Sequence, residues 1–339
     1  MKSSDYDFEL PRIYEFLQNS KVVALQFPEG LLSFAEEIAL KIEDQLDILT
    51  IVIADVAYGA CNADFSLIKE MQCDSFIHFG HSELVKGYLP SLYIPCKRTD
   101  SDVVQLCQKV NNYCEENNYK NIALTTTSQT FHFLPEMLKL LKQNITFSDF
   151  PALNKSETLG CTCKTFGSVD AIFSIVDGIF HAEGAVAMNK NIPVFRVDPR
   201  SLEIDREGQD VEARLEKREQ LVDKIRGLQD SICFVLGTMG GQGSITLLQK
   251  YVKLAEQKFR KVYKMMVPEV YPQALNIPKC QIYVQMACPR LTIDWGEYYG
   301  NVINTVEFEK LLCPDIEDYP FLNFCGTKEV GSHLNTWNQ

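Results

Sequence analysis

Short, continuous apolar runs rich in valine, isoleucine and phenylalanine alternate along this chain with segments of helical periodicity. Such runs are typical of strands covered on both faces, because a strand with one solvated face alternates apolar and polar residues instead. Between them, Leu31–Gln45 and Ile245–Phe259 carry apolar side chains three and four residues apart, which predicts helices. The alternation therefore predicts an α/β protein built on parallel sheets. The predicted strands are Val22–Phe27, Leu49–Val56, Ser75–Phe79, Leu92–Pro95, Ile122–Thr127, Ile145–Phe150, Ala171–Val176, Pro193–Val197, Ile232–Gly237, Lys261–Val267 and Ile282–Ala287.

The strand–helix–strand pattern also recurs, with new starts near Lys21, Asn121 and Ser231. This recurrence predicts three structurally related α/β units of little sequence identity. The charge-dense segment Asp205–Asp230 keeps apolar residues at helical spacing, which predicts a connecting helix, and the polar stretch Asn111–Lys120 is compatible with an earlier boundary. We expect a first unit at 1–115, a second at 116–205, the connecting helix with a third unit at 206–320, and a loosely held C-terminal tail at 321–339.

Charge and hydropathy narrow the classes of function. The formal net charge is −12, which disfavours nucleic acid as a partner because phosphates would be repelled. No apolar stretch approaches the ~20 residues that a membrane-spanning helix needs, and Met1–Asp7 lacks the apolar core of a signal peptide. We therefore expect a cytoplasmic protein without a membrane partner, whose thiols stay reduced. Each of its 12 cysteines is by default a small buried apolar residue rather than half of a disulfide.

Three cysteines differ from that default. Cys61, Cys161 and Cys288 each follow a small residue, in a loop at or soon after the carboxyl end of a predicted strand. Open α/β sheets bind their ligands at that end of the strands. Three thiolates without a nearby fourth ligand suit an iron–sulfur cluster with one open iron, although zinc also favours thiolates. Spacing alone leaves scattered structural thiols open as an alternative, and Cys163 could face the same pocket as Cys161.

Histidines and glycines also gather at the predicted strand ends. His81 and His181 each lie near a glutamate, so each pair could bind metal or orient a substrate, while a hydrogen-bonded structural role is the common one for a single histidine. The turn Phe27–Leu31 could receive an anion on its backbone N–H groups, or it could simply begin a helix. The glycine-rich segment Gly237–Ser244 contains no lysine and is not a Walker A sequence.

Taken together, these segments resemble the first-step enzymes of diphthamide synthesis, the 2-(3-amino-3-carboxypropyl)histidine synthases. The matching segments occur in the family's order over about residues 20–300. The segment Leu236–Ser244 and the ending Asp294-Trp295-Gly296 resemble the eukaryotic subunit 1 type more than the archaeal homodimeric form. The resemblance rests on Phe27-Pro28-Glu29-Gly30-Leu31, Asp55 through Cys61, His78-Phe79-Gly80-His81-Ser82, Leu159-Gly160-Cys161, Asp177-Gly178-Ile179-Phe180-His181 and, most specifically, Gln285 through Gly296.

The resemblance implies a fold, a cofactor and a reaction. The fold is three related Rossmann-like units, each with a small parallel sheet, arranged around a central cluster site. One cysteine from each unit holds a 4Fe-4S cluster, and these match Cys61, Cys161 and Cys288. The open iron binds S-adenosylmethionine, which is cleaved reductively in a non-conventional radical reaction. The 3-amino-3-carboxypropyl group is then transferred to imidazole C2 of a histidine of elongation factor 2. A radical route suits this carbon, because it is a poor nucleophile.

The resemblance further implies partners and a binding pocket. Besides elongation factor 2, the partners are a related second subunit or a second copy of the chain, and a small electron-donating iron protein. Eukaryotic members often carry a second cysteine where this chain has Asn62, and Cys163 matches no family position. A non-catalytic partner subunit of the same fold and a structural zinc protein remain alternatives, and the presence of all three cysteines favours the catalytic role. Our candidates for lining the adenosylmethionine pocket are Asp55, Tyr58, His81, His181, Gln242, Arg290 and Asp294.

Overall fold

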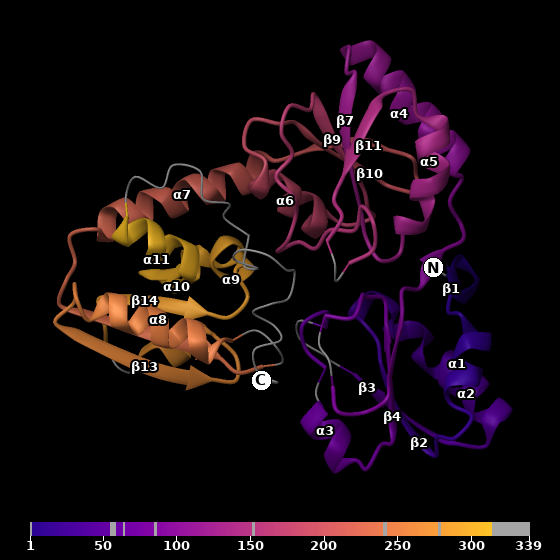
Figure 1. The fold of residues 1–339 in the computed structure, drawn as a ribbon, viewed down its shortest axis with the longest axis horizontal. Coiled ribbons are helices and arrows are strands. Elements are labelled where there is room, and N and C mark those ends of the chain that lie inside the picture. The colour runs from indigo at the N-terminus through magenta and orange to yellow at the C-terminus, as the bar shows by residue number, and fades with distance from the viewer. Residues whose placement is uncertain are drawn as a thin grey trace.

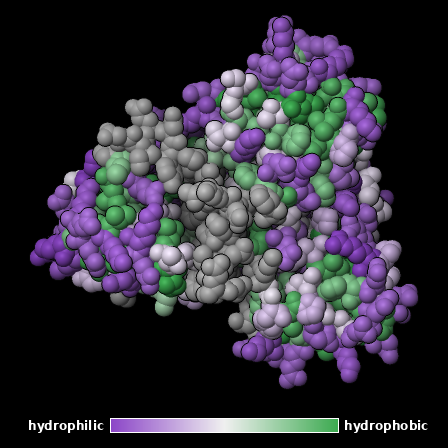
Figure 2. All heavy atoms as spheres, in the orientation of Figure 1, coloured by the Kyte–Doolittle hydropathy of each residue, from purple (hydrophilic) through white to green (hydrophobic). Residues whose placement is uncertain are grey.

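The computed structural model describes residues 2–54, 59–63, 65–84, 87–150, 153–239, 243–276 and 279–313. Within these ranges the chain is an α/β protein with three small, mainly parallel sheets, as the alternating pattern predicts (Figure 1). Hydrophilic side chains cover most of the outer surface of all three parts in the view of Figure 2. Among the described helices none is both long and apolar enough to cross a membrane.

The first sheet is entirely parallel and has the strand order β3–β2–β4–β5. Its core is closed by the helices that follow β2 and by the N-terminal helix α1, whose apolar side chains pack together with those of the strands. The strands are β2 (Val22–Gln26), β3 (Leu49–Ile53), β4 (Ser75–Phe79) and β5 (Ser91–Ile94), and the helices are α1 (Leu10–Phe16), η2 (Glu29–Phe34), α2 (Ala35–Leu46) and α3 (Phe65–Glu70).

The second sheet has the order β11–β10–β9–β7–β8, with β11 antiparallel to β10 and the other pairs parallel. A short antiparallel pair joins β1 (Tyr6–Asp7), which follows η1 (Ser3–Asp5) near the N-terminus, to β6 (Lys97–Arg98), which comes just before α4 in the chain. The elements of this part are α4 (Val103–Asn117), β7 (Asn121–Thr126), η3 (Phe131–Phe133), α5 (Leu134–Leu140), β8 (Asn144–Phe147), β9 (Ala171–Ile175), α6 (Ile179–Met188), β10 (Val194–Val197) and β11 (Ile204–Glu207).

The third sheet is parallel, with the order β13–β12–β14–β15. The long helix α7 runs from the second part of the molecule to the third, where it packs beside α11 (Figure 1). The elements are α7 (Gln209–Ile225), β12 (Ser231–Gly237), α8 (Ile245–Ala255), β13 (Lys261–Val267), η4 (Pro272–Asn276), β14 (Ile282–Met286), α9 (Arg290–Asp294), α10 (Gly296–Tyr299), β15 (Val302–Asn304) and α11 (Thr305–Leu312).

Helix ends follow local capping chemistry. Asp102 begins α4 by accepting a hydrogen bond from the backbone N–H of Gln105 at 2.9 Å, and Ser244 begins α8 in the same way. Helix α4 ends at Asn118, which adopts a left-handed backbone conformation with φ 59°. These caps satisfy terminal backbone groups that have no partner inside the helix.

All three sheets share one strand order. In each, the first strand of the unit (β2, β7 or β12) lies between the second and third strands in the chain. The chain therefore leaves the first strand towards one edge of the sheet and later returns to build the sheet towards the other edge. Open α/β sheets bind ligands beyond the carboxyl ends of the strands at the point where this direction changes. The three candidate cysteines follow β3, β8 and β14, so each belongs to the carboxyl end of its own sheet.

Two sequence predictions need correction. The segment Asp205–Asp230 is not a single helix, because its first residues lie in the polar edge strand β11 and helix α7 begins only at Gln209. The polar stretch Asn111–Lys120 is mostly the end of α4, whose buried face joins the core of the second sheet. The predicted boundary after residue 115 therefore falls inside a helix that belongs with the second sheet. The predicted tail, 321–339, lies outside the described residues.

Candidate functional site

Cys61 lies partly buried in the loop that follows β3. The fully buried Gln26, at the end of the neighbouring strand β2, donates its side-chain amide to the carbonyl of Asn62 at 2.7 Å. The backbone immediately after Cys61 is thereby attached to the sheet. The Cys61 side chain packs against a small apolar cluster formed by Leu84, Leu153 and Leu159, and Cys161 packs against the same cluster.

Cys161 lies at the tip of a tight turn between Leu159 and Thr162. The backbone groups of these two residues bond to each other in both directions, at 2.9 and 3.1 Å. The buried Thr158 hydroxyl donates to the Thr162 carbonyl at 2.6 Å, and the Thr158 N–H donates to the carbonyl of Thr126 at the end of β7. The turn that presents Cys161 is therefore held to the carboxyl end of the second sheet.

Cys163 faces away from this turn. It is buried in a separate apolar core with Phe166 and Ile172, and burial raises the pKa of its thiol to about 12. Because Cys161 is partly exposed and packs in a different cluster, the two neighbouring thiols do not share a pocket.

Cys288 follows β14 and is held by a third buried side chain. The amide nitrogen of Gln285 donates to the carbonyl of Cys288 at 2.9 Å, and its amide oxygen accepts from the N–H of Ala287 at 2.9 Å. Burial raises the pKa of the Cys288 thiol to about 12, and the neighbouring Cys161 contributes to the increase. Cys161 and Cys288, 127 residues apart in the chain, therefore lie within electrostatic range of each other.

A cavity of about 220 Å³ lies between the carboxyl ends of the first two sheets. His81, which follows β4, and His181, in the first turn of α6, both line it. The ring of His81 receives or donates a hydrogen bond at 2.8 Å with the buried His78. Burial lowers the pKa of both His81 and His181 to about 4, with His181 adding to the effect on His81 and Arg290 to that on His181. Both imidazoles are therefore neutral at pH 7.

The segments around the cavity approach one another closely at glycines. Gly80 has φ +80°, and a Cβ there would lie 2.9 Å from the ring of Pro28. A Cβ on Gly59, two residues before Cys61, would lie 3.3 Å from the ring of His81. The glycines thus allow the Cys61 loop and the turn after β2 to pack directly against the loop after β4.

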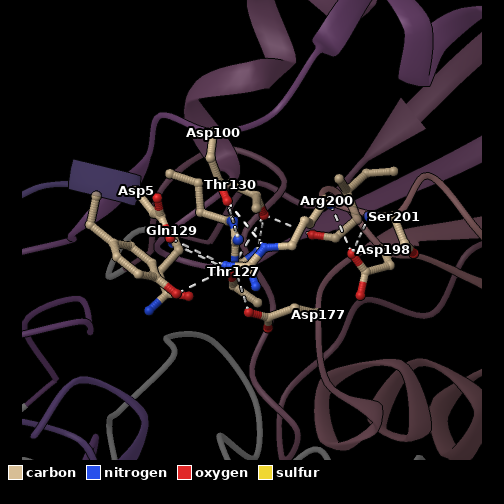
Figure 3. Close-up of polar contacts among 12 residues, drawn as sticks. Asp5, Asp100, Thr127, Gln129, Thr130, Asp177, Asp198, Arg200 and Ser201 are labelled. Carbon is tan, nitrogen blue, oxygen red and sulfur yellow. Dashed lines mark hydrogen bonds and ion pairs between the residues drawn. The ribbon is translucent and has the colours of Figure 1, made fainter. Parts of the chain in front are cut away.

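Two acidic residues of the cavity were not among the predicted site residues. Glu157, four residues before Cys161, is buried and accepts hydrogen bonds from Ser82 and Asn154, and burial raises its pKa. Asp177 pairs with the buried Arg98 at 2.9 Å, within the polar network of Figure 3. Glu157 is the single acidic residue between Asp149 and Asp170, and its position four residues before Cys161 was the available signal.

The predicted pocket residues fall into three groups. His81 and His181 line one cavity, as described above. Arg290 and Asp294 lie instead in α9, where the Arg290 Nε donates to an Asp294 oxygen at 3.0 Å, and neither lines that cavity. Asp55, Tyr58 and Gln242 lie outside the described residues.

Over the part of the chain that the structure describes, no group of three or more histidine, cysteine, aspartate or glutamate side chains is placed to hold a single metal ion. A cluster of several irons is itself wider than one ion, so its thiolate ligands stand further apart. The three partly buried thiols on separate strand-end loops are compatible with that wider kind of centre.

Comparison with known proteins agrees with this arrangement. Residues 27–320 match a family model described as "Putative diphthamide synthesis protein". The chain is 32% identical over 320 residues to 2-(3-amino-3-carboxypropyl)histidine synthase subunit 1 of Caenorhabditis elegans, an alignment that covers 87% of this chain and 77% of the relative. It is 30% identical over 354 residues to the human protein of the same name, with 98% and 77% covered.

A solved structure is similar over nearly the whole chain. The crystal structure of Dph2 from Pyrococcus horikoshii with a 4Fe-4S cluster superposes with a TM-score of 0.79 at 26% identity, covering 96% of this chain and 94% of that one. At this coverage the match extends across all three sheets. From the family model, the relatives and this structure, we conclude that the chain belongs to the diphthamide synthesis protein family.

Proposed function

We propose that this protein transfers the 3-amino-3-carboxypropyl group of S-adenosylmethionine to a histidine of elongation factor 2, the first step of diphthamide synthesis. The observation that carries the proposal is the approach of three strand-end thiols: Cys161 lies within electrostatic range of Cys288 and shares an apolar cluster with Cys61. The relatives that carry the name of this enzyme, and the similar structure with a 4Fe-4S cluster, support the same conclusion.

Cys61, Cys161 and Cys288 would hold a 4Fe-4S cluster and leave one iron without a protein ligand. The donor set fits such a group, because all three thiols are partly buried and come from separate sheets. When bound, the cluster supplies the electron for reductive cleavage between the sulfonium sulfur and the aminocarboxypropyl carbon. The protein's own contribution is placement: Gln26, Thr158 and Gln285 hold the three cysteine loops to their sheets.

The cavity between the first two sheets is our candidate for part of the adenosylmethionine pocket. Neutral His181 can donate and accept a hydrogen bond there, and His81, whose Nδ1 is bonded to His78, can offer its Nε2, while Glu157 and Asp177 favour a ligand with positive charge. Asp55, Tyr58 and Gln242 remain candidates for the same pocket on sequence grounds.

We further propose the wider setting that the family resemblance implies. The three sheets are three related Rossmann-like units arranged around the cluster, and their common strand order supports this. The chain acts in the cytoplasm with a related second subunit or a second copy of itself, and a small iron protein supplies electrons. The designation "subunit 1" of the relatives supports an assembly of more than one subunit.

The test is a reaction with purified components under anaerobic conditions. The protein is incubated with dithionite, S-adenosylmethionine and unmodified elongation factor 2, with and without the second subunit. Mass spectrometry is expected to find an added aminocarboxypropyl group on one histidine. A colourless protein with stoichiometric zinc, or a brown protein that leaves the factor unmodified in both arrangements, contradicts the proposal.

A further inference from the structure

We propose that Arg290 is a positioning residue that locks the Cys161 turn against the Cys288 loop, so that the two thiols are held together before any cluster is present. The assignment of these thiols as ligands rests on the proposed function, whereas the contacts of Arg290 do not.

Arg290 joins the two cysteine loops directly. It begins α9 two residues after Cys288, and its side chain is 4% exposed. Its Nη1 donates to the carbonyl of Gly160 at 3.3 Å and to the carbonyl of Phe180 at 3.1 Å. Gly160 is the residue immediately before Cys161. One side chain from the third sheet's loop thus binds backbone next to the second sheet's cysteine.

Close packing around Gly160 makes this contact rigid. The Arg290 guanidinium lies 4.4 Å from the centroid of the Phe180 ring, a favourable cation–π arrangement. A Cβ on Gly160 would come within 2.1 Å of that ring, and a Cβ on Gly184 in α6 would lie 2.8 Å from the Gly160 carbonyl oxygen. The backbone before Cys161 is therefore held between the backbone of α6 and the Arg290 side chain, with the half-exposed Phe180 ring lying over Gly160.

The charge of Arg290 is balanced within the same junction. Its Nη2 pairs with Glu183 of α6 and, at 2.8 Å, with Asp294 of α9. Arg214 of α7 pairs with the same two carboxylates. Removal of one partner from a buried ion pair is strongly destabilising, because it leaves an uncompensated charge. Two guanidiniums and two carboxylates thus connect three helices between the second and third sheets.

Every donor of the Arg290 guanidinium is already committed. Of its five N–H groups, the one on Nε faces Asp294, the two on Nη1 face backbone carbonyls, and the two on Nη2 face Glu183 and Asp294. None remains for a substrate carboxylate, which argues against the pocket-lining role expected from sequence. Lysine has three donors on a single nitrogen and cannot reproduce this planar fork.

The test compares Arg290→Lys with Arg218→Lys in the full-length chain. Arg218 is a matched control, because its buried guanidinium binds Glu307 and the carbonyl of Val302 and contacts no cysteine loop. Hydrogen exchange is measured at amides 159–162 in the anaerobic protein stripped of iron, together with the rates at which Cys61, Cys161 and Cys288 react with iodoacetamide. Iron content and the paramagnetic resonance spectrum of the reduced protein are measured after reconstitution.

We expect Arg290→Lys to increase exchange at amides 159–162 by about tenfold and to make Cys161 react faster relative to Cys61. Iron retention should fall and the resonance spectrum should change. Arg218→Lys should leave iron content, the spectrum and the relative alkylation rates unchanged, and should raise exchange at amides 159–162 no more than its lower global stability predicts. Equal protection of amides 159–162 in Arg290→Lys and wild type overturns the proposal. An equal loss of protection in the Cys61 loop also overturns it, because the effect would then not be local to the Cys161 turn.

A second variant covers the case in which Arg290→Lys fails to fold. Gly184→Ala places a methyl group 2.8 Å from the Gly160 carbonyl oxygen, which Arg290 binds, and so displaces the same turn without changing any charge. It should reproduce the exchange and alkylation pattern, and wild-type behaviour of this variant also overturns the proposal. If wild type binds no iron but the exchange pattern appears as expected, the proposed function fails while the role of Arg290 stands.

Discussion

Two buried arginines join neighbouring parts of this molecule, and they do so in different ways. Arg290 lies between the second and third sheets, and Arg98, in β6, lies between the N-terminal segment and the second sheet. Their side chains are 4% and 2% exposed. Each binds two carboxylates, and each lies against an aromatic ring, Phe180 for Arg290 and Tyr6 for Arg98.

The difference lies in the remaining contacts. Among the residues that the structure describes, the Arg98 guanidinium binds side chains alone, namely Asp100, Asp177 and Tyr6, and Asp100 in turn binds Arg200 (Figure 3). Arg290 gives two of its donors to backbone carbonyls, one of them next to Cys161. A side-chain partner can rotate away, but a backbone partner moves only with its loop. Burial and charge alone therefore do not reveal which arginine sets the position of a thiol.

The strongest effect is expected from removal of the three thiols themselves, which tests whether they are ligands. Cys61→Ala, Cys161→Ala and Cys288→Ala should each lose the cluster and reduce transferase activity to background, because each removes a ligand. Cys163→Ala is the matched control and should keep most of both, since Cys163 packs in a separate core. Iron and sulfide content per chain and visible absorbance are the measurements. A full cluster in Cys161→Ala, with loss in Cys163→Ala, would mean that the wrong thiol of the pair was chosen.

The next prediction separates the two junctions. Arg98→Met leaves Asp100 and Asp177 without their buried partner and should lower the free energy of unfolding by about 2 kcal/mol, less than for a fully buried pair because both carboxylates are partly exposed. Iron content should stay at the wild-type level. Denaturant unfolding and iron analysis measure the two effects. If Arg98→Met loses iron as readily as a variant of Arg290, the two arginines do not differ in their effect on the cysteine loops.

Acid should affect the cavity next to the Arg98 junction. The pKa values of His81 and His181 are about 4 in the folded protein, against ~6.5 when unfolded, so the unfolded state takes up protons first as the pH falls. The stability that neutral histidines contribute is complete above pH ~6.5 and is lost towards pH ~4, by about 1–2 kcal/mol at pH ~5 after allowance for partial exposure. The free energy of unfolding, measured with denaturant at about pH 7 and at about pH 5, gives the loss. The double variant His81→Gln with His181→Gln should show a smaller loss, and an equal loss would contradict the assignment.

The smallest expected effect concerns the side chains that hold the cysteine loops. Thr158→Val removes the hydroxyl that binds the Thr162 carbonyl, and Thr125→Val removes a buried hydroxyl pair with Ser174 in the sheet itself. Each should lower the free energy of unfolding by about 1 kcal/mol. Only Thr158→Val should also shorten the time for which iron is retained against a chelator. Equal retention in both variants would show that this hydroxyl has no specific role in placing Cys161.

Much of the fold could be predicted because the central strands are buried along nearly their whole length, whereas the edge strands β3, β8 and β13 are partly exposed but still rich in β-branched or aromatic residues. Each strand of the first sheet corresponds to an apolar run, and the structure confirms them with small shifts at the ends. Strand β11 was missed because its sequence, Ile-Asp-Arg-Glu, is that of a solvated edge. Helix α4 was divided because its last turns are polar on the solvent side, while Cys114 on the other side enters the core.

The strands, the helices between them and the three cysteines that follow strands could all be recognised from the amino-acid sequence, because burial of apolar runs and local turn chemistry act over a few neighbouring residues. The folded chain was needed to see that Cys161 and Cys163 pack in different apolar clusters, that His81 and His181 share a cavity, and that all five donors of Arg290 are used within the protein. These properties depend on which distant segments pack together, and no spacing along a single chain contains that information.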